Sequence, residues 1–373
     1  MSGSGEGADA AAIMRSMRQR MPWMAAQKAL AAEGLPRGKG WDLTVAKLSA
    51  SEALTSEQLI ALRKILVEHE ICGEKLVSFH RVDESRRAAL SEALRSTDVE
   101  ENAFTRLYPA VLSEEAIEHN FPHPLTLTAI VECGTGIAVV FSATRGLTFR
   151  EEVDREGLPP AARDALAGYD ELLGIKQEKR QTFDVVYVPD GEDLIDVRVD
   201  YPDGMLRGAA QAAQLQVCRA FNHLVGFEAL GLPVNLFPLI DAMYRAPAEG
   251  TVVEIAFGTT TASTKFERMR RQHLCLREEV YHRAGSSALA SPIEPFRLSI
   301  QWSVHLADDV FTRPELSFQS TQRMRDSENP ELFGVVVRDT SGYQDFDYVK
   351  ARLQHFLTAL GEAQAVPSTD AAD

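Results

Sequence analysis

The spacing of hydrophobic residues along the chain changes near residue 120. Between residues 9 and 120, apolar side chains recur every three or four positions, which is the repeat of one helix face. Met14, Met17, Met21 and Met24 show this spacing, and we interpret their stripe as core. Thr55 with Gln58, in turn, forms the capping-box pattern that begins a helix. The sequence therefore predicts an all-α lobe over residues 9–120.

After the Pro/His break at residues 121–124, the pattern becomes strand-like. Residues 125–132, 137–142, 182–188 and 194–201 are predicted to be strands, with turn residues between them. In the last of these strands we expect Asp196, Arg198 and Asp200 to face water. Further strands are predicted at residues 251–257, 296–305, 316–321 and 332–338, with helices at residues 205–225, from about 262 to 283, and 346–360. We thus expect an α+β protein whose helical N-terminal lobe precedes a larger, mainly antiparallel sheet with packed helices over residues 121–360.

The two ends of the chain differ in composition from the segments beside them. Residues 1–8 have the composition of a Gly/Ser linker, and residues 361–373 form a polar, Ala-rich tail. Such segments carry little apolar surface to bury. We expect both ends to be disordered.

The charge balance limits the partners of this protein. The chain carries 39 Lys and Arg against 54 Asp and Glu, a formal net charge of −15. Most of its surface therefore repels polyanions, so any contact with nucleic acid must use a local basic patch. Apolar runs stay shorter than the ~18 residues that a membrane span needs, and the N-terminus does not read as a signal peptide. We expect a cytoplasmic protein without membrane contact, and its Ala-rich, Arg-over-Lys usage suggests a bacterial source.

One hydroxyl-rich segment is a candidate anion site. A predicted strand ends at Gly258 and a predicted helix opens at Lys265, with threonines and a serine between them. Helix N-termini present unpaired N–H groups to anions, although the Walker A sequence is missing and a plain helix cap is the alternative. The candidate phosphate-binding or nucleic-acid-binding residues here are Gly258, Thr259, Thr260, Thr261, Ser263, Thr264, Lys265, Arg268 and Arg271. On the predicted helix, Phe266 and His273 fall on the stripe that we expect to be buried.

A second basic segment lies near the N-terminus. Its candidate contacts are Arg15, Arg18, Arg37 and Lys39, and Trp23 and Trp41 lie close by in the sequence. Residues 29–48 predict a helix, a Gly/Pro loop and a second helix, and in outline they are similar to the SAP-type DNA-binding helix-loop-helix. That similarity implies contact with DNA.

Signatures of common enzymes and metal sites are missing from the sequence. It contains no nucleophile elbow, zincin motif, kinase set or dinucleotide fingerprint. The cysteines form no CxxC pair, and Pro122 disfavours a helix that would join His119 to His123. We therefore expect no cofactor and no metal.

Three classes of function fit these observations. The first is a non-catalytic accessory protein that contacts nucleic acid or another phosphate-bearing ligand through its basic segments. The second is a protein-interaction scaffold or homo-oligomer without affinity for nucleic acid. The third is an enzyme of unrecognised class, for which a pocket with converging polar groups would be the sign.

Overall fold

One ten-stranded sheet runs through most of the molecule and organises the helices around it. The computed structural model describes residues 3–50, 54–259, 263–271 and 274–365. All neighbouring strands of the sheet are antiparallel, and their order is β2-β3-β4-β5-β1-β12-β11-β8-β6-β7. Its strands are β1 (Lys75–Arg81), β2 (Thr126–Cys133), β3 (Gly136–Glu152), β4 (Leu173–Pro189), β5 (Leu194–Asp200), β6 (Thr251–Gly258), β7 (Thr264–Arg268), β8 (Glu294–Gln301), β11 (Glu315–Gln319) and β12 (Val335–Arg338). Strands β9 (Val304–Ala307) and β10 (Val310–Thr312) form a separate pair.

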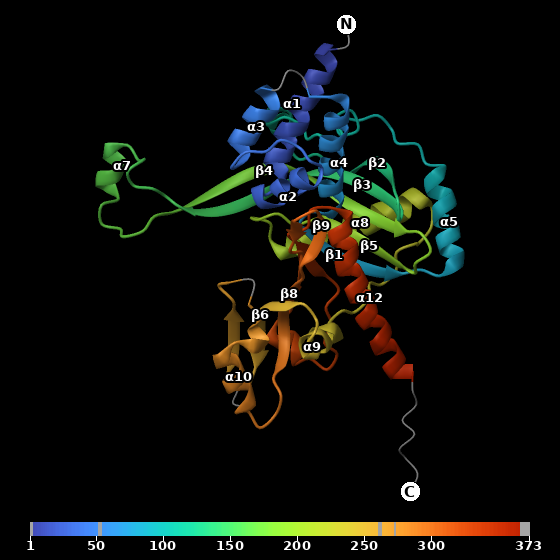
Figure 1. Cartoon of the computed structure of the whole chain (residues 1–373), viewed down its shortest axis with the longest axis vertical. Helices are drawn as coiled ribbons and strands as arrows, with labels where there is room; N and C mark the ends of the chain where they lie inside the picture. Colours follow the sequence, from blue (N-terminus) through green and yellow to red (C-terminus); the bar gives the residue numbers. More distant parts are fainter. Residues whose placement is uncertain (1–2, 51–53, 260–262, 272–273, 366–373) are drawn as a thin grey trace.

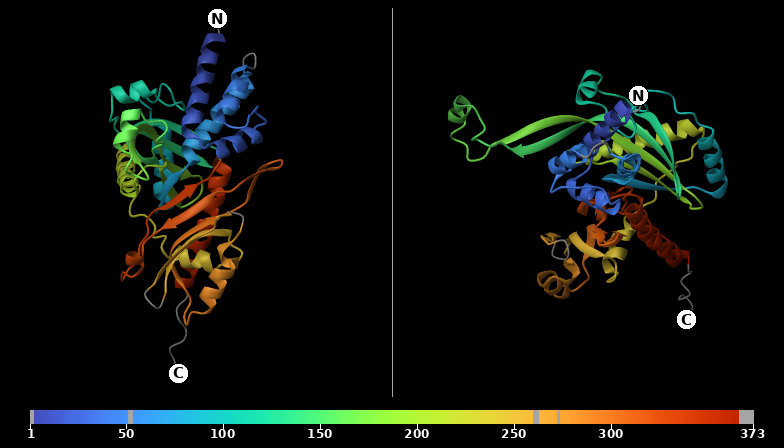
Figure 2. Two further views of the ribbon diagram at one scale, coloured as in Figure 1. Left: turned by 90° about the vertical axis from the view of Figure 1, so that its left-hand side faces the viewer. Right: turned by 45° about the horizontal axis from the view of Figure 1, so that its top comes forward.

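Twelve helices and one 3-10 turn complete the part of the chain that the structure describes. They are α1 (Gly3–Arg20), α2 (Trp23–Ala32), α3 (Trp41–Ala50), α4 (Ser56–Cys72), α5 (Glu84–Arg95), α6 (Glu114–His119), α7 (Pro160–Ala165), α8 (Arg207–Val225), α9 (Pro238–Arg245), η1 (Leu276–Glu278), α10 (Val280–Ser287), α11 (Gln322–Arg325) and α12 (Tyr343–Ala365). The predicted α+β class is confirmed. The helices α1 to α4 gather at one end of the molecule, while β6, β8 and α10 lie at the other (Figures 1 and 2).

Helices cover both faces of the sheet, because its central strands carry apolar side chains on both faces. On one face, residues of β1, β4, β8 and β12 pack against α4, α9 and α12. On the other face, β1, β3, β5 and β12 pack against α5 and α8. The helical lobe has a core of its own, to which Met14, Met17 and Met21 contribute, whereas Met24 is exposed. The core interpretation of the methionine stripe is correct for three of its four members.

Local signals in the sequence placed several elements correctly. The Thr55 hydroxyl accepts the Gln58 N–H and the Gln58 side chain accepts the Thr55 N–H, so the predicted capping box begins α4. The turn at residues 190–193 joins β4 to β5 as predicted. Helix α8 and strand β6 also lie within a few residues of their predicted bounds.

Three expectations about the chain's organisation were wrong. Strand β1 interrupts the segment that was predicted to be wholly helical, because its apolar run after Gly73 pairs with β5 and β12 in the middle of the sheet. Residues 3–8 belong to α1 rather than to a linker. The predicted tail begins inside α12, which extends to Ala365, and residues 366–373 lie outside the described part. The division into two lobes near residue 120 stays a prediction.

Candidate functional site

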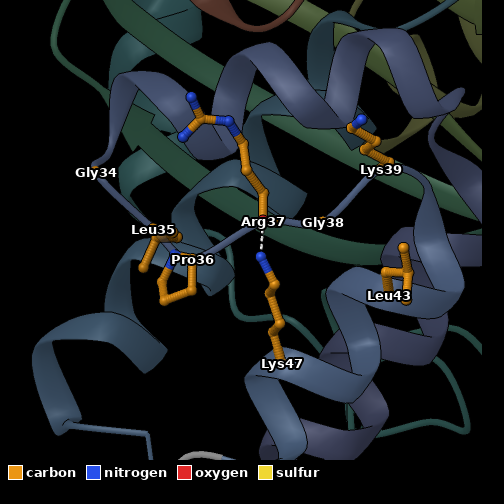
Figure 3. A pocket seen from close by; sticks show the side chains of 8 residues that line it. All are labelled: Gly34, Leu35, Pro36, Arg37, Gly38, Lys39, Leu43 and Lys47. Atoms are coloured by element: carbon orange, nitrogen blue, oxygen red, sulfur yellow. Dashed lines mark hydrogen bonds between the residues drawn. The ribbon is translucent and has the colours of Figure 1, made fainter.

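The connection between α2 and α3 forms a shallow basic hollow. We call residues 34–40 the basic loop. With Leu43 and Lys47 of α3, this loop lines a hollow of about 520 Å³ (Figure 3). Arg37, Lys39 and Lys47 are all exposed, and the lining contains three cations and no carboxylate. In a chain with a net charge of −15, this is a local reversal of sign.

Three glycines and one buried hydroxyl hold the basic loop in its conformation. Gly34 and Gly40 have φ angles of 66° and 106°, in the left-handed region that favours glycine. A Cβ atom on Gly38 would lie 2.4 Å from the Leu43 Cβ, so the loop also needs glycine for its close approach to α3. The Gly38 N–H donates to the Thr44 hydroxyl over 2.8 Å, and Thr44 is fully buried. The loop is therefore fixed to α3 before any ligand arrives.

The three cations of the hollow differ in their contacts. Lys47 donates from Nζ to the Arg37 carbonyl over 2.9 Å and so braces the loop. Figure 3 shows the Arg37 and Lys39 side chains extending from the opposite side of the loop. Within the described residues, neither the Arg37 nor the Lys39 side chain has a hydrogen-bond or ion-pair partner, which leaves both open to an anion. Lys47 was missed by sequence reasoning, although its position four residues after Leu43 puts both on one face of α3.

The structure distributes the other N-terminal candidates differently. Arg18 forms an ion pair with Asp42 at 2.7 Å, which offsets its charge beside the loop. Arg15 lines a separate hollow of about 490 Å³ that also contains Glu114. The Trp23 and Trp41 rings pack edge to face, with centroids 5.6 Å apart, against the core of the helical lobe. Because these rings are committed to packing, the site offers charges to a phosphate rather than a stacking platform to a base.

The candidate site at residues 258–271 lacks its predicted helix. Gly258 ends β6 and residues 264–268 form β7, so the described segment turns back as a hairpin because β7 pairs with β6 along five positions. Lys265 is exposed on this edge strand, while Arg268 lies 3.8 Å from Glu254. Phe266, predicted to be buried, is 56% exposed. The predicted helix N-terminus, and with it the argument for an anion site there, was wrong.

The remaining candidates of this segment have no common anion geometry. The Thr259 hydroxyl accepts the Ser263 N–H, and the Thr264 hydroxyl donates to Gln322. Arg271 is exposed in the loop after β7. Thr260, Thr261 and His273 lie outside the described residues. The basic loop and the β6–β7 hairpin lie at opposite ends of the molecule, so the two basic segments do not share a surface (Figures 1 and 2).

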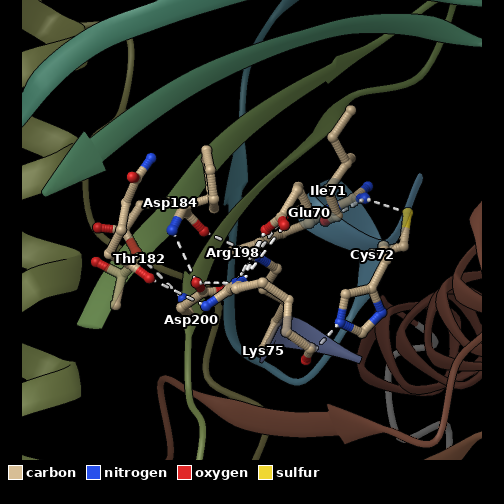
Figure 4. Close-up of polar contacts among 12 residues, drawn as sticks. Glu70, Ile71, Cys72, Lys75, Thr182, Asp184, Arg198 and Asp200 are labelled. Atoms are coloured by element: carbon tan, nitrogen blue, oxygen red, sulfur yellow. Dashed lines mark hydrogen bonds and ion pairs between the residues drawn. The ribbon is translucent and has the colours of Figure 1, made fainter. Parts of the chain in front are cut away.

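Beneath the helical lobe, the polar face of β5 is buried rather than solvated. Asp200 accepts from Lys75 Nζ and Arg20 Nη2, each over 2.5 Å, and from the Phe183 N–H over 2.7 Å. Arg20 also donates to Glu70, with Nη2 and Oε2 2.9 Å apart. Lys75 further donates to the carbonyls of Glu70 and Phe183 (Figure 4). This network ties α1 and α4 to three strands of the sheet.

A second buried cluster continues along the same face of β5. The Arg198 guanidinium bonds to Asp196, and neither side chain is exposed. Arg198 also lies over the Phe346 ring, 3.7 Å from its centroid, and donates to Cys72 Sγ over 3.3 Å. Lys350 of α12 reaches Asp196 at 3.0 Å. The solvent-facing interpretation of Asp196, Arg198 and Asp200 was therefore wrong, because α1, α4 and α12 cover the face on which these charges neutralise one another.

Burial shifts the titration of the groups around this network. Burial, together with Arg20 and Lys75, lowers the pKa of His69 to about 3. Burial likewise raises the pKa of Glu74 to about 7 against the opposing charge of Arg338. Burial acts to raise the pKa of Asp200 as well, but Arg20 and Lys75 outweigh it and hold that pKa at about 2. These groups therefore make stability depend on pH.

One arrangement of a histidine, a carboxylate and a hydroxyl has the form of a proton relay. His282 Nδ1 lies 2.6 Å from Glu267 Oε2, and Nε2 lies 2.8 Å from the Tyr244 hydroxyl. Only 2% of the His282 side chain is exposed, and both ring nitrogens are engaged. The imidazole therefore has no edge open to a substrate, and we interpret the three residues as a clamp that joins α9, β7 and α10.

Among the described residues, no group of three or more His, Cys, Asp or Glu side chains is placed to hold a metal ion. No helix in the described part of the chain is both long and apolar enough to span a membrane. The chain matches no protein-family model, and no curated protein or solved structure is found to be similar to it.

Proposed function

We propose that the protein is a non-catalytic cytoplasmic accessory protein that contacts nucleic acid through phosphates at the basic loop. The observation that carries this proposal is the pair of exposed cations Arg37 and Lys39 on a rigid loop whose hollow contains no carboxylate. Phosphate contacts supply most of the sequence-independent affinity of nucleic-acid-binding proteins. The packed tryptophans favour contact with the backbone over base stacking.

The helix-loop-helix at residues 29–48 adds support. Helices α2 and α3 flank the Gly/Pro loop, as the outline similarity to the SAP-type element requires. The basic loop joins α2 to α3 in the helical lobe, which gathers at one end of the molecule (Figure 1). A duplex backbone at this loop would therefore meet local positive charge before it meets the negative charge of the whole chain.

The test compares two double charge reversals. Fluorescence anisotropy with labelled duplex DNA and labelled single-stranded RNA, titrated at several salt concentrations, measures affinity and its salt slope. We expect Arg37→Glu/Lys39→Glu to weaken binding at least ~10-fold and to reduce the salt slope by about two, because two phosphate contacts are lost.

Lys265→Glu/Arg268→Glu, on the β6–β7 hairpin, is the matched control with the same change in net charge. Equal loss in both variants would point to net charge rather than to the basic loop. Unchanged binding in the first variant, or a native protein that does not bind, would contradict the proposal.

A second candidate function is protein interaction, which the long β3–β4 hairpin favours. Its outer half projects from the molecule with exposed Leu173 and Ile175. This observation is independent of the basic loop.

A further inference from the structure

The outer halves of β3 and β4 leave the sheet as a two-stranded arm, residues 148–177, with α7 near its tip (Figures 1 and 2). Strand β2 pairs with β3 only as far as Ser142, and β5 pairs with β4 only from Val185. Beyond these points β3 and β4 pair only with each other. Both edges of the arm therefore expose unpaired backbone groups.

Contacts between the arm and the rest of the molecule end near its base. The Thr148 N–H donates to the Gly204 carbonyl over 3.0 Å, and Lys179, two residues after the arm, pairs with Glu118. Among the described interactions, the hydrogen bonds of residues 150–175 all stay within the arm, and α7 has no buried residue. An isolated two-stranded ribbon is at best marginally stable in water. Its length is thus better explained by a partner than by the fold itself.

One face of the arm combines two aliphatic side chains with two opposite charges. Residues directly opposite one another in an antiparallel pair share a face. Arg150 is opposite Ile175, and Glu152 is opposite Leu173. Leu173 and Ile175 are each 68% exposed, and Arg150 and Glu152 have no ion-pair partner in the described structure. The other face carries Phe149, which packs against the body near Gly204, whereas on the aliphatic face contact with the body begins at Lys179, which pairs with Glu118 of α6.

The charge of the arm argues against a nucleic-acid partner. Residues 150–175 carry seven carboxylates and three arginines, so their formal net charge is −4. A phosphate backbone is negative along its whole length and would be repelled from this segment, whereas a partner with the same net charge can bind only where opposite charges face one another. Leu173 and Ile175 lie side by side on one face and form a small exposed apolar patch that a protein partner can cover.

We propose that this face binds the same face of a second copy of the chain, across a two-fold axis that crosses the strands between residues 150 and 152. Such an axis reverses the strand direction, so Arg150 of one copy faces Glu152 of the other. The same operation places Leu173 of one copy on Ile175 of the other. A face that matches itself in both charge and apolar contact satisfies the requirement of a two-fold interface.

The size of the arm sets the expected strength of this dimer. One face of an arm of about thirty residues offers fewer contact residues than the roughly 20–30 that each side of a standard interface contributes. Its apolar centre consists of only two aliphatic pairs. We therefore expect a dimer that dissociates on dilution rather than an obligate one.

Sedimentation equilibrium of the full chain over a wide range of concentration measures the dimer dissociation constant. Arg150→Glu places like charges opposite one another, and Ile175→Glu puts a carboxylate into the aliphatic pair. Each is expected to raise the dissociation constant at least ~10-fold. The reciprocal exchange Arg150→Glu/Glu152→Arg preserves the charge match and should restore dimerisation to near the native level.

Arg323→Glu on α11 makes the same change in net charge far from the arm and serves as the control. Thermal unfolding should change little in all four variants, because these side chains lie outside the packed cores. A native chain that is monomeric at every concentration would overturn the proposal. So would a dimer that resists Arg150→Glu and Ile175→Glu, or one that the reciprocal exchange fails to rescue. None of these variants alters the basic loop. A negative result for the dimer therefore does not bear on the nucleic-acid proposal, which is tested separately.

Discussion

Arg20 and Asp200, 180 residues apart in the chain, form a buried ion pair with Nη2 and Oδ2 2.5 Å apart. Arg20 ends α1, and Asp200 ends β5. The pair therefore fastens the helical lobe to the centre of the sheet. Glu70 and Lys75 complete the network with one further charge of each sign, so the buried charges balance.

Removing one member of this network should cost far more than removing a surface charge. Arg20→Met leaves two buried carboxylates without their shared guanidinium, and we expect it to lower the free energy of unfolding by about 3–5 kcal/mol. Arg18→Met, two residues earlier on the same helix, breaks only an exposed pair and should cost less than about 1 kcal/mol. Urea denaturation of both variants tests this. Similar losses in the two would show that the network does not hold α1 in place.

His69 should make the protein less stable in mild acid. Its pKa is about 3 in the folded state against 6.5 for an ordinary histidine, so the unfolded chain takes up the proton first. The free energy of unfolding therefore falls as the pH drops from 6.5 toward 3, by up to about 1.4 kcal/mol per pH unit. His69→Gln should flatten this part of the stability profile. Denaturant unfolding at a series of pH values in this window provides the measurement, and an unchanged slope would contradict the assignment.

Glu74 should make the protein less stable as the pH rises from 4.5 toward 7. Its pKa is raised from 4.5 to about 7 in the folded state, so the unfolded chain loses the proton first. Its contribution to stability is therefore fully present below pH 4.5 and is lost as the pH rises toward 7, on the order of 3 kcal/mol in all. Compared with the native chain, Glu74→Gln should gain stability at pH 7 relative to pH 4.5. Glu328→Gln, at an exposed position, is the control and should show no such gain.

Gly38→Ala should disturb the basic loop while keeping its cations. The added Cβ would lie 2.4 Å from the Leu43 Cβ and 2.8 Å from the Leu43 carbonyl carbon, so the loop or α3 must shift. We expect a loss of about 1–3 kcal/mol of stability, as for other overpacked sites, together with weaker binding to labelled duplex DNA. Gly208→Ala on α8, where a Cβ meets nothing within 4 Å, is the control. Native affinity in Gly38→Ala would show that loop geometry is unimportant for binding.

Local patterns in the sequence were sufficient for many elements of the fold. The Thr55 capping box, the turn between β4 and β5, and the short apolar run of β6 each involve neighbours in the chain, so their chemistry acts wherever the segment lies. The α2–loop–α3 unit was likewise predicted, because its glycines and proline signal a loop locally. Arg37 and Lys39 belong to that loop, which is why two of the three cations of the candidate site could be predicted from the sequence.

What the sequence determined by itself was local: helix starts, turns, the change of hydrophobic period near residue 120, and the charge of the basic loop. Tertiary structure alone decided the rest. The alternation in β5 gives two faces of opposite polarity but does not say what covers the polar one, and α1, α4 and α12 bury Asp196, Arg198 and Asp200 among matching charges. Residues 264–268 likewise satisfy a helical repeat, yet they form β7 because β6 offers them a ladder of backbone hydrogen bonds. Long-range pairing overrides local preference where a segment has a partner strand or a covering helix, and neither is written in the segment itself.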